Sequence, residues 1–436
     1  MATSCSEPLG GFVRSLFGRV CLTLFAIAIF AESGSAQNAL TWQEVRDKFE
    51  NSNPTLLADK LNIDESKAEE ITQYLRPNPS FTALEDGTQL APYQGTWRPL
   101  SGTEVQGSFS YLHEREHKRE LRLEAQQDNT QVTVDAHADL ERNLIFNLRS
   151  AFVGILQAKA LYKLAQDDLA YYDKVLEISR ATFAAGGIAQ IDMDRLDLQR
   201  VQYESEIETA DVNLRTAKIQ LLTMLNDRTP IDQFDVTGTF DFDDNLQPLD
   251  DFRKIALDNR PDLKEALESV VEAQTNHKLA VSNGSTDPTL SAWYTYNPSF
   301  NNPYDHQTLG ASVSIPLRIF DRNQGEKQRT QLDITLHQRL QDAAEAQVFS
   351  DVDSGYVTLK STLNLLRPYK AKYLDLSTRV RDTVTFSYQH GGASLLDFLN
   401  AEADYRSVQI TYLSLVGTYL TSAAQLNMAV GKDVIQ

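Results

Sequence analysis

The chain has 436 residues, a formal net charge of −19 and two cysteines. Such acidity argues against a nucleic-acid partner and favours a cationic or cation-tolerant environment, although it also suits any soluble exported protein. Because Cys5 and Cys21 both fall in the N-terminal segment described next, we expect a mature chain with no disulfide and no thiolate metal site.

Residues 1–36 have the layout of a secretory signal peptide. Arg14 and Arg19 precede an apolar run from Val20 to Ala31, and small residues lead to a cleavage point before Gln37. The run is too short to span a bilayer, and no later stretch of about eighteen apolar residues follows it. We therefore expect an exported protein without a transmembrane helix.

The remainder of the chain repeats one layout. An opening helical segment that ends at Pro54 is matched by another that ends at Pro261. Each is followed by alternating segments and then by long helical ones. We expect a first repeat over residues 37–228, a linker with a short strand over residues 229–248, and a second repeat over residues 249–436.

In each repeat the helical part is a long hairpin that is reversed by a pair of glycines. The stretch 119–185 contains no proline and is rich in Ala, Leu, Gln and Glu, which predicts a helix of about 100 Å. Glycine adopts the left-handed backbone that ends a helix, so it suits the reversal. The turns are expected at Gly186, Gly187, Gly391 and Gly392.

The helix that follows the first turn carries two apolar stripes. One has the spacing of a coiled coil, and the second comprises Leu198, Val201, Val212, Ile219 and Leu222. Helices with two such stripes contact a neighbour on each side, as in the wall of a tube. Pro368 interrupts the long helix of the second repeat only, so we expect a kink there.

Four short segments alternate with a period of two instead. Residues 308–315 place apolar side chains on one face and small polar ones on the other, and residues 80–84, 105–111 and 289–296 are similar. Such strands are typical of outer-membrane barrels, but amphipathic hairpins of a soluble protein also show this pattern. Because the smallest closed barrels need about eight strands, several chains must share one barrel if these strands enter a bilayer.

The order of these elements resembles the outer-membrane efflux protein family, the TolC-like exit ducts. The resemblance is carried by the runs at 259–263 (NRPDL), 314–325 (SIPLRIFDRNQG) and 388–401 (YQHGGASLLDFLNA). The second run is most similar to the CzcC-type branch, which exports heavy-metal cations. The resemblance implies a mainly α fold with a β-barrel part, in which three copies form a shared twelve-stranded barrel and an α-helical periplasmic tunnel.

This resemblance also implies a function and partners. A homotrimer in outer-membrane lipid would passively conduct divalent heavy-metal cations that it receives from a periplasmic adaptor (a membrane fusion protein) and an inner-membrane pump. No enzymatic activity and no cofactor are expected. A channel of the same fold that exports drugs or polypeptides is one alternative, and a soluble periplasmic coiled-coil adaptor is another.

The resemblance places the tunnel entrance at the glycine turns. Asp397 matches an acidic entrance position of the family, whereas the next acidic position is Asn400 in this chain. Tyr388 matches a tyrosine of the tip and Asp192 the acid of the first half, but an arginine of the family is replaced by Ala393. A ring of Asp397 carboxylates is therefore the expected electrostatic gate, and helix capping is the alternative role of both aspartates.

One motif suggests a different chemistry. Residues His113 to His117 read H-E-R-E-H, the pattern in which two histidines one helical turn apart bind zinc. The motif directly follows an alternating segment and no clear third ligand lies nearby. We therefore expect a solvated helix start, with no metal site and no catalytic residue, and we keep a secreted zinc hydrolase as the alternative.

Overall fold

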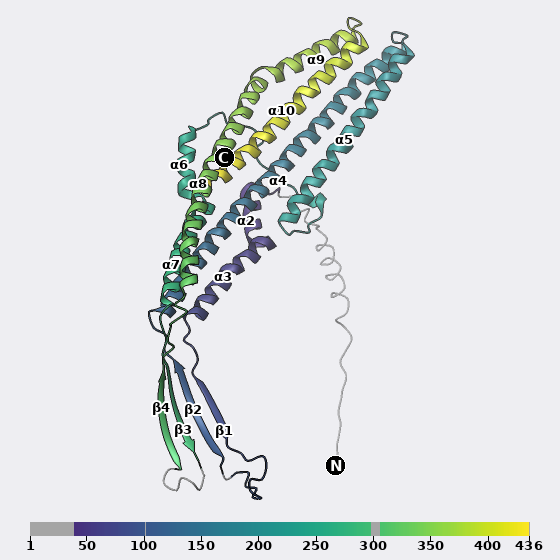
Figure 1. Ribbon diagram of the computed structural model, residues 1–436. Coiled ribbons are helices and arrows are strands. Elements are labelled where there is room, and N and C mark those ends of the chain that lie inside the picture. Colours follow the sequence, from purple (N-terminus) through teal and green to yellow (C-terminus); the bar gives the residue numbers. More distant parts are fainter. Residues whose placement is uncertain (1–38, 101, 298–305, 436) are drawn as a thin grey trace, which may run out of the picture.

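The same series of elements occurs twice along the chain: two short helices, two strands and a long helical hairpin. The structure, a computed structural model, describes residues 39–100, 102–297 and 306–435, so the predicted signal peptide lies outside the described residues (Figure 1). The first series is α2 (Trp42–Ser52), α3 (Pro54–Tyr74), β1 (Ser80–Asp86), β2 (Glu104–Leu112), α4 (Lys118–Ala184) and α5 (Gln190–Met224). The second is α6 (Leu249–Asn259), α7 (Pro261–Ser282), β3 (Thr289–Tyr296), β4 (Gln307–Ser314), α8 (Gln324–Pro368), α9 (Leu374–Gln389) and α10 (Leu395–Val430). The predicted repetition of helical hairpins and strand pairs is confirmed.

The molecule is a long rod with its strands at one end and its helical turns at the other (Figure 1). The four helices near the turns lie side by side in the order α9, α10, α4, α5. Helices α2 and α6 flank the middle of the rod, where the C-terminus also lies. The α4–α5 hairpin and the α9–α10 hairpin are called the first and second hairpin below.

The long helix of the second repeat is interrupted where the sequence places a proline. Helix α8 ends at Pro368, and the next residues, Tyr369–Tyr373, form a π-helical turn before α9 begins. Proline lacks the N–H that would continue the α-helical hydrogen bonding, and such turns change the direction of a helix. Helix α4 runs for 67 residues without a break. The kink predicted for one hairpin alone is confirmed, and it is visible in Figure 1.

The linker between the repeats does not contain the strand that we predicted. Ile231–Gln233 is a 3₁₀ turn, and beyond it Val236 alone makes a β-bridge, with Leu40. Phe234 and Val236 are buried in a cluster with Leu148 and other residues of α4 and α5. The alternating apolar residues of the linker therefore pack on helices, and no longer segment lies beside them to pair as a strand.

The four strands form one antiparallel sheet in the order β1-β2-β3-β4. One face carries apolar side chains that no part of the described chain covers, among them Phe81, Phe109, Tyr294, Leu309 and Val313. The opposite face has a row of serines in register, one from each strand: Ser80, Ser110, Ser291 and Ser312. Within the described chain β1 and β4 are the free edges of the sheet. The sheet is therefore apolar on one face and polar on the other, and both of its edge strands are unpaired on their outer sides within the described chain.

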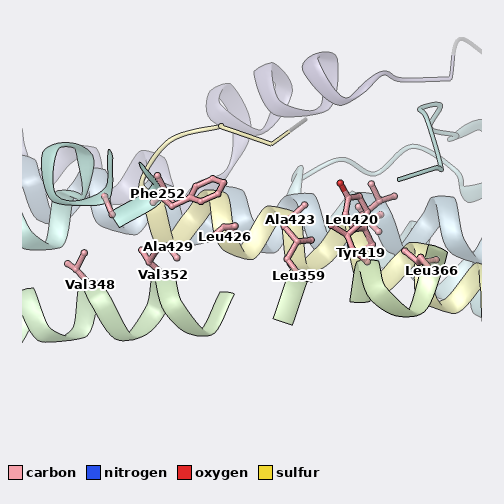
Figure 2. Packing of buried hydrophobic residues seen from close by; sticks show 14 of the residues in the cluster. Phe252, Val348, Val352, Leu359, Leu366, Tyr419, Leu420, Ala423, Leu426 and Ala429 are labelled. Carbon is pink, nitrogen blue, oxygen red and sulfur yellow. The ribbon is translucent and has the colours of Figure 1, made fainter. Parts of the chain in front are cut away.

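The second repeat is held together by a buried cluster between α6, α8 and α10 (Figure 2). Phe252 of α6 packs on Val352 of α8 and on Leu426 of α10, all of them fully or almost fully buried. Close packing of this kind is sensitive to the loss of single methyl groups.

One described helix, α4, is long and apolar enough by length and composition to cross a membrane. Its residues Leu148, Phe152 and Ile155 are instead buried against α2 and the linker. Its contacts with α5, α7 and α10 place it within the helical wall. We therefore assign the apolar stretch of α4 to the packing of the rod.

A buried arginine accounts for the NRPDL run of the sequence. Arg260 directly precedes α7 and is 2% exposed. Its Nη1 donates to Oδ2 of Asp351 in α8 at 2.8 Å and to the carbonyl oxygen of Ala429 in α10 at 3.2 Å, and its Nε donates to Oδ1 of Asp262 at 2.9 Å. One guanidinium thus joins α7, α8 and α10 in the middle of the rod.

Replacing Arg260 is expected to destabilise the fold. Arg260→Ala would leave Asp262 and Asp351 near one another without their shared cation. Because these acids are 26% and 34% exposed, the expected cost lies below the value of about 3–5 kcal/mol for a fully buried ion pair. The matched control is Arg253→Ala, because Arg253 and Asp353 are 34% and 40% exposed and such pairs contribute about 0.2–1 kcal/mol. Circular dichroism of the detergent-solubilised protein during thermal unfolding measures both changes. Equal effects of the two substitutions would contradict the anchoring role of Arg260.

Candidate tunnel entrance

Both hairpins turn by the same backbone motif. Gly186 and Gly391 have φ values of +80° and +72°, in the left-handed region. In the first turn the N–H of Gly186 donates to the carbonyl oxygen of Phe183 and that of Gly187 to the carbonyl oxygen of Thr182, each at 2.9 Å. This is the Schellman arrangement, which satisfies the last carbonyl groups of a helix.

The second turn repeats these bonds. The N–H of Gly391 donates to the carbonyl oxygen of Tyr388 at 3.1 Å, and the N–H of Gly392 donates to that of Ser387 at 2.7 Å. The structure therefore places all four glycines at the two reversals, which lie together at one end of the rod (Figure 1).

Asp397 lies in the first turn of α10 and forms a capping box with Ser394. Its Oδ2 accepts hydrogen bonds from the backbone N–H and the hydroxyl of Ser394 at 3.0 and 2.7 Å, and Ser394 Oγ accepts one from the Asp397 N–H at 3.2 Å. These hydrogen bonds hold the pKa of the Asp397 carboxyl below its usual value. The carboxylate is exposed and ionised at neutral pH, and it has the capping role that we considered as the alternative.

Asp192 has the equivalent position in α5 but different contacts. The residue that precedes α5 is Ala189, whose side chain cannot cap a helix. The Asp192 carboxylate instead lies 3.7 Å from Nη1 of Arg195, one turn further along. The two aspartates are therefore equivalent in position and unequal in environment, because Ser394 in one turn corresponds to Ala189 in the other.

Asn400 lies exposed one turn after Asp397, and Asp404 lies exposed one turn further. Residues at this spacing share a face of α10, so Asp404 extends the line that begins at Asp397. Our sequence reasoning did not identify Asp404. Its helical spacing from Asp397 and Asn400 was the available signal.

Tyr388 lies in an aromatic stack that joins the two hairpins. Its ring is parallel to that of Phe398, with centroids 5.1 Å apart and an interplanar angle of 14°. Phe398 stacks in turn on Tyr172 of α4 at 6.2 Å, and Tyr172 contacts Tyr203 of α5 at 4.7 Å. Burial raises the pKa of the Tyr388 hydroxyl.

The same stack includes one hydrogen bond between helices. The hydroxyl of Tyr172 donates to the carbonyl oxygen of Leu196 at 2.9 Å, and both residues are fully buried. This hydrogen bond joins α4 to α5 within the first hairpin, and the second hairpin packs on the first near its turn through apolar and aromatic contacts. The sequence reasoning identified Tyr388 but not Tyr172 or Phe398.

The outer faces of the wall are apolar and uncovered. On α5, which is one edge of the four-helix layer, the predicted second stripe is exposed at Leu198, Val201, Val212 and Ile219. Leu222 was wrongly placed in that stripe, because it is buried in the core beside α2 and α4. On α9, the other edge, Leu376, Val380 and Phe386 are exposed. Both edges of the layer are suited to a neighbouring helix.

The His113–His117 motif does not have the geometry of a zinc site. His113 follows β2, and His117 has a left-handed backbone (φ 55°) directly before α4, so the two do not lie one turn apart on a helix. The neighbouring Lys118 is buried and pairs with Asp287 at 2.6 Å. In the described ranges no group of three His, Cys, Asp or Glu side chains is placed to hold a metal ion.

A rod of paired helical hairpins with a four-stranded amphipathic sheet at its far end is a TolC-like fold. Residues 253–432 match the profile of the outer membrane efflux protein family. The chain is 21% identical over 420 residues to the cobalt-zinc-cadmium resistance protein CzcC of Cupriavidus metallidurans, with 91% of each chain covered.

Solved structures support the same fold. That of the CusC channel matches with a TM-score of 0.75 at 16% identity, covering 90% of this chain and 92% of the other. That of the CmeC outer membrane channel of Campylobacter jejuni matches with a TM-score of 0.73 at 14% identity, covering 91% and 87%. The predicted resemblance to this family and the predicted TolC-like fold of the single chain are confirmed.

The matched profile is that of a family of transport proteins without catalytic activity, and the matched CmeC structure is that of an outer membrane channel. The soluble adaptor and the zinc hydrolase are therefore set aside.

Proposed function

We propose that the protein is the exit channel of a tripartite efflux system that passively conducts divalent heavy-metal cations across the outer membrane. The observation that carries this proposal is the relation to a cobalt-zinc-cadmium resistance protein along 91% of both chains. The CzcC-like run at residues 314–325 and the net charge of −19 support it. A periplasmic adaptor and an inner-membrane pump would deliver the cations to the helical end of the rod.

Loss of the gene from the organism that encodes it tests the proposed cargo. We expect the inhibitory concentrations of cobalt, zinc and cadmium ions to fall several-fold and those of organic drugs to stay unchanged, with recovery when the gene is returned. The opposite pattern, drug sensitivity with normal metal tolerance, would support the drug-exporting alternative and contradict the metal proposal.

We further propose that three copies of the chain share one barrel. Four strands cannot close a barrel, and unpaired backbone groups at the edges of β1 and β4 are costly in a bilayer. The uncovered apolar faces of α5 and α9 would then meet between copies and continue the helical wall into a tunnel. Each copy would be divided as predicted from the sequence, into repeats over residues 37–228 and 249–436 with a linker between them.

The purified protein in detergent is accordingly expected to be a trimer. Its mass, measured by native mass spectrometry or light scattering, should be three times that of the mature chain. A stable monomer that retains its helical content would contradict the shared barrel.

Asp397 is proposed as the main charge of the entrance, with Asp192, Asp404, Asn400 and Tyr388 around it. Three copies would place three exposed carboxylates at the turn of the second hairpin, and such rings favour cations over anions. The capping box keeps the Asp397 carboxylate ionised at neutral pH, since it lowers the pKa.

Asp397→Ala is expected to reduce the cation selectivity of the channel in planar bilayers while the trimer stays intact. The reversal potential in a salt gradient measures selectivity, and Asp342→Asn in α8 is a control, because Asp342 is an exposed acid on the far side of Pro368 from the turn. Loss of the cap is expected to cost about 1 kcal/mol at the start of α10. Ser394→Ala, which removes the cap and keeps the charge, separates the two effects. Selectivity that is unchanged in Asp397→Ala would count against the entrance role.

A further inference from the structure

Two buried carboxylates lie where the four helices of the tunnel wall meet. Glu402 of α10 is 4% exposed and Asp168 of α4 is 7% exposed. One carboxylate oxygen of Glu402, Oε1, is fully buried and has no hydrogen-bond partner among the described residues. Glu402 lies about two turns from the start of α10, close to the aromatic stack. An ionised carboxylate without partners is costly at such a place.

The nearby cations are already engaged by other acids. Arg381 of α9 lies between the rings of Tyr171 and Tyr405, at 4.2 and 3.9 Å from their centroids, and pairs with Asp382 at 2.9 Å. Arg406 of α10 lies over the ring of Tyr203 and pairs with Glu206 of α5. In the described chain no ion pair joins either arginine to Glu402 or Asp168.

Every helix around the two carboxylates contributes titratable or charged groups. These groups are Asp167, Tyr171 and Tyr172 from α4, Tyr203 and Glu206 from α5, Arg381 and Asp382 from α9, and Tyr405 and Arg406 from α10. Acids outnumber the two arginines once Glu402 and Asp168 are ionised. Protonation of these two would bring the cluster closer to neutrality.

The effect of the surroundings on proton affinity follows from this geometry. Burial raises the pKa of Glu402 to about 7, with a further increase from Asp168 and an opposing effect of Arg381 and Arg406. Burial also raises the pKa of Asp168 to about 6. Both carboxyls thus change charge near neutral pH, in contrast to Asp397 at the turn.

We propose that Glu402 and Asp168 form a proton-dependent joint between the first and second hairpins, which packs tightly when both carboxyls are protonated and loosens when they ionise. A group whose pKa is raised by folding stabilises the packed form below its unfolded pKa, and this contribution is lost as the pH rises through the folded value. The packed joint is therefore favoured in acid, and its stability falls as the pH rises through about 6 to 7. The inference rests on the channel fold and not on the proposed metal cargo.

Hydrogen–deuterium exchange of the detergent-solubilised full chain tests the joint. After correction for the chemical exchange rate, the protection factors of peptides around Glu402 are expected to fall by more than about tenfold between about pH 5.5 and about pH 8.5. Glu402→Gln and Asp168→Asn, which mimic the protonated groups, should each reduce this change, and the double variant should abolish it. Glu177→Gln is the matched control, because Glu177 is exposed on α4, the helix of Asp168, and it should behave as the wild type.

Two results would overturn the proposal: protection near Glu402 that does not depend on pH in the wild type, or a double variant that keeps the full pH dependence. If Glu402→Gln does not fold, Asp168→Asn alone still tests the joint. Because the measurement needs no cargo, adaptor or pump, it can fail while metal tolerance depends on the gene, and it can succeed while metal tolerance does not.

Discussion

The free edges of the four-stranded sheet are the constraint on which the rest of the structure depends. Backbone N–H and C=O groups cannot remain unpaired in lipid, and β1 and β4 have no partner strand within the described chain. In the proposed trimer, neighbouring copies would pair with these groups and would also cover the exposed apolar residues of α5 and α9. The edge strands and the edge helices would thus both be completed by another copy of the chain. At each end of the rod, one edge comes from the first repeat (β1, α5) and the other from the second repeat (β4, α9).

The two hairpins are equal in backbone and unequal in side-chain chemistry. The hydrogen bonds of the two glycine turns are the same, so the reversal itself is a property of the repeat. Ser394 caps α10 where Ala189 leaves α5 uncapped, and the buried Glu402 belongs to the second repeat. The capped entrance aspartate and the buried Glu402 thus belong to the second hairpin, whereas the first hairpin contributes the buried Asp168.

Much of the fold could be predicted from the sequence, because helix length, strand alternation and proline position are local properties. The extent of α4 and the break at Pro368 both follow from such patterns. The strand predicted in the linker was wrong because Phe234 and Val236 alternate to pack on helices, and Leu222 was misplaced for a similar reason. Periodicity shows which residues of a segment share a face, but it does not show which other segment packs against that face.

The candidate site was less predictable for the same reason. Tyr388 and Asp397 were identified through a resemblance, whereas the stack of Tyr172 on Phe398 depends on contacts between distant segments. A signal for Glu402 did exist, because it continues the buried positions Leu395 and Phe398 of α10 at helical spacing. A charged residue in a buried stripe can be recognised in the sequence, but the groups that surround it cannot.

The π-helical turn at Tyr369–Tyr373 affects which residues of α9 face the core relative to those of α8. Buried positions continue at α-helical spacing along α8 to Leu366, and beyond the turn Thr385 is offset by about one residue from that series. One residue corresponds to about 100° of rotation around a helix axis, so the wider turn absorbs an angular mismatch between the two segments. A chain one residue shorter at this point could form a regular helix with the same residues facing inward, whereas a regular helix of the present length would turn Tyr388 by about 100° away from Phe398.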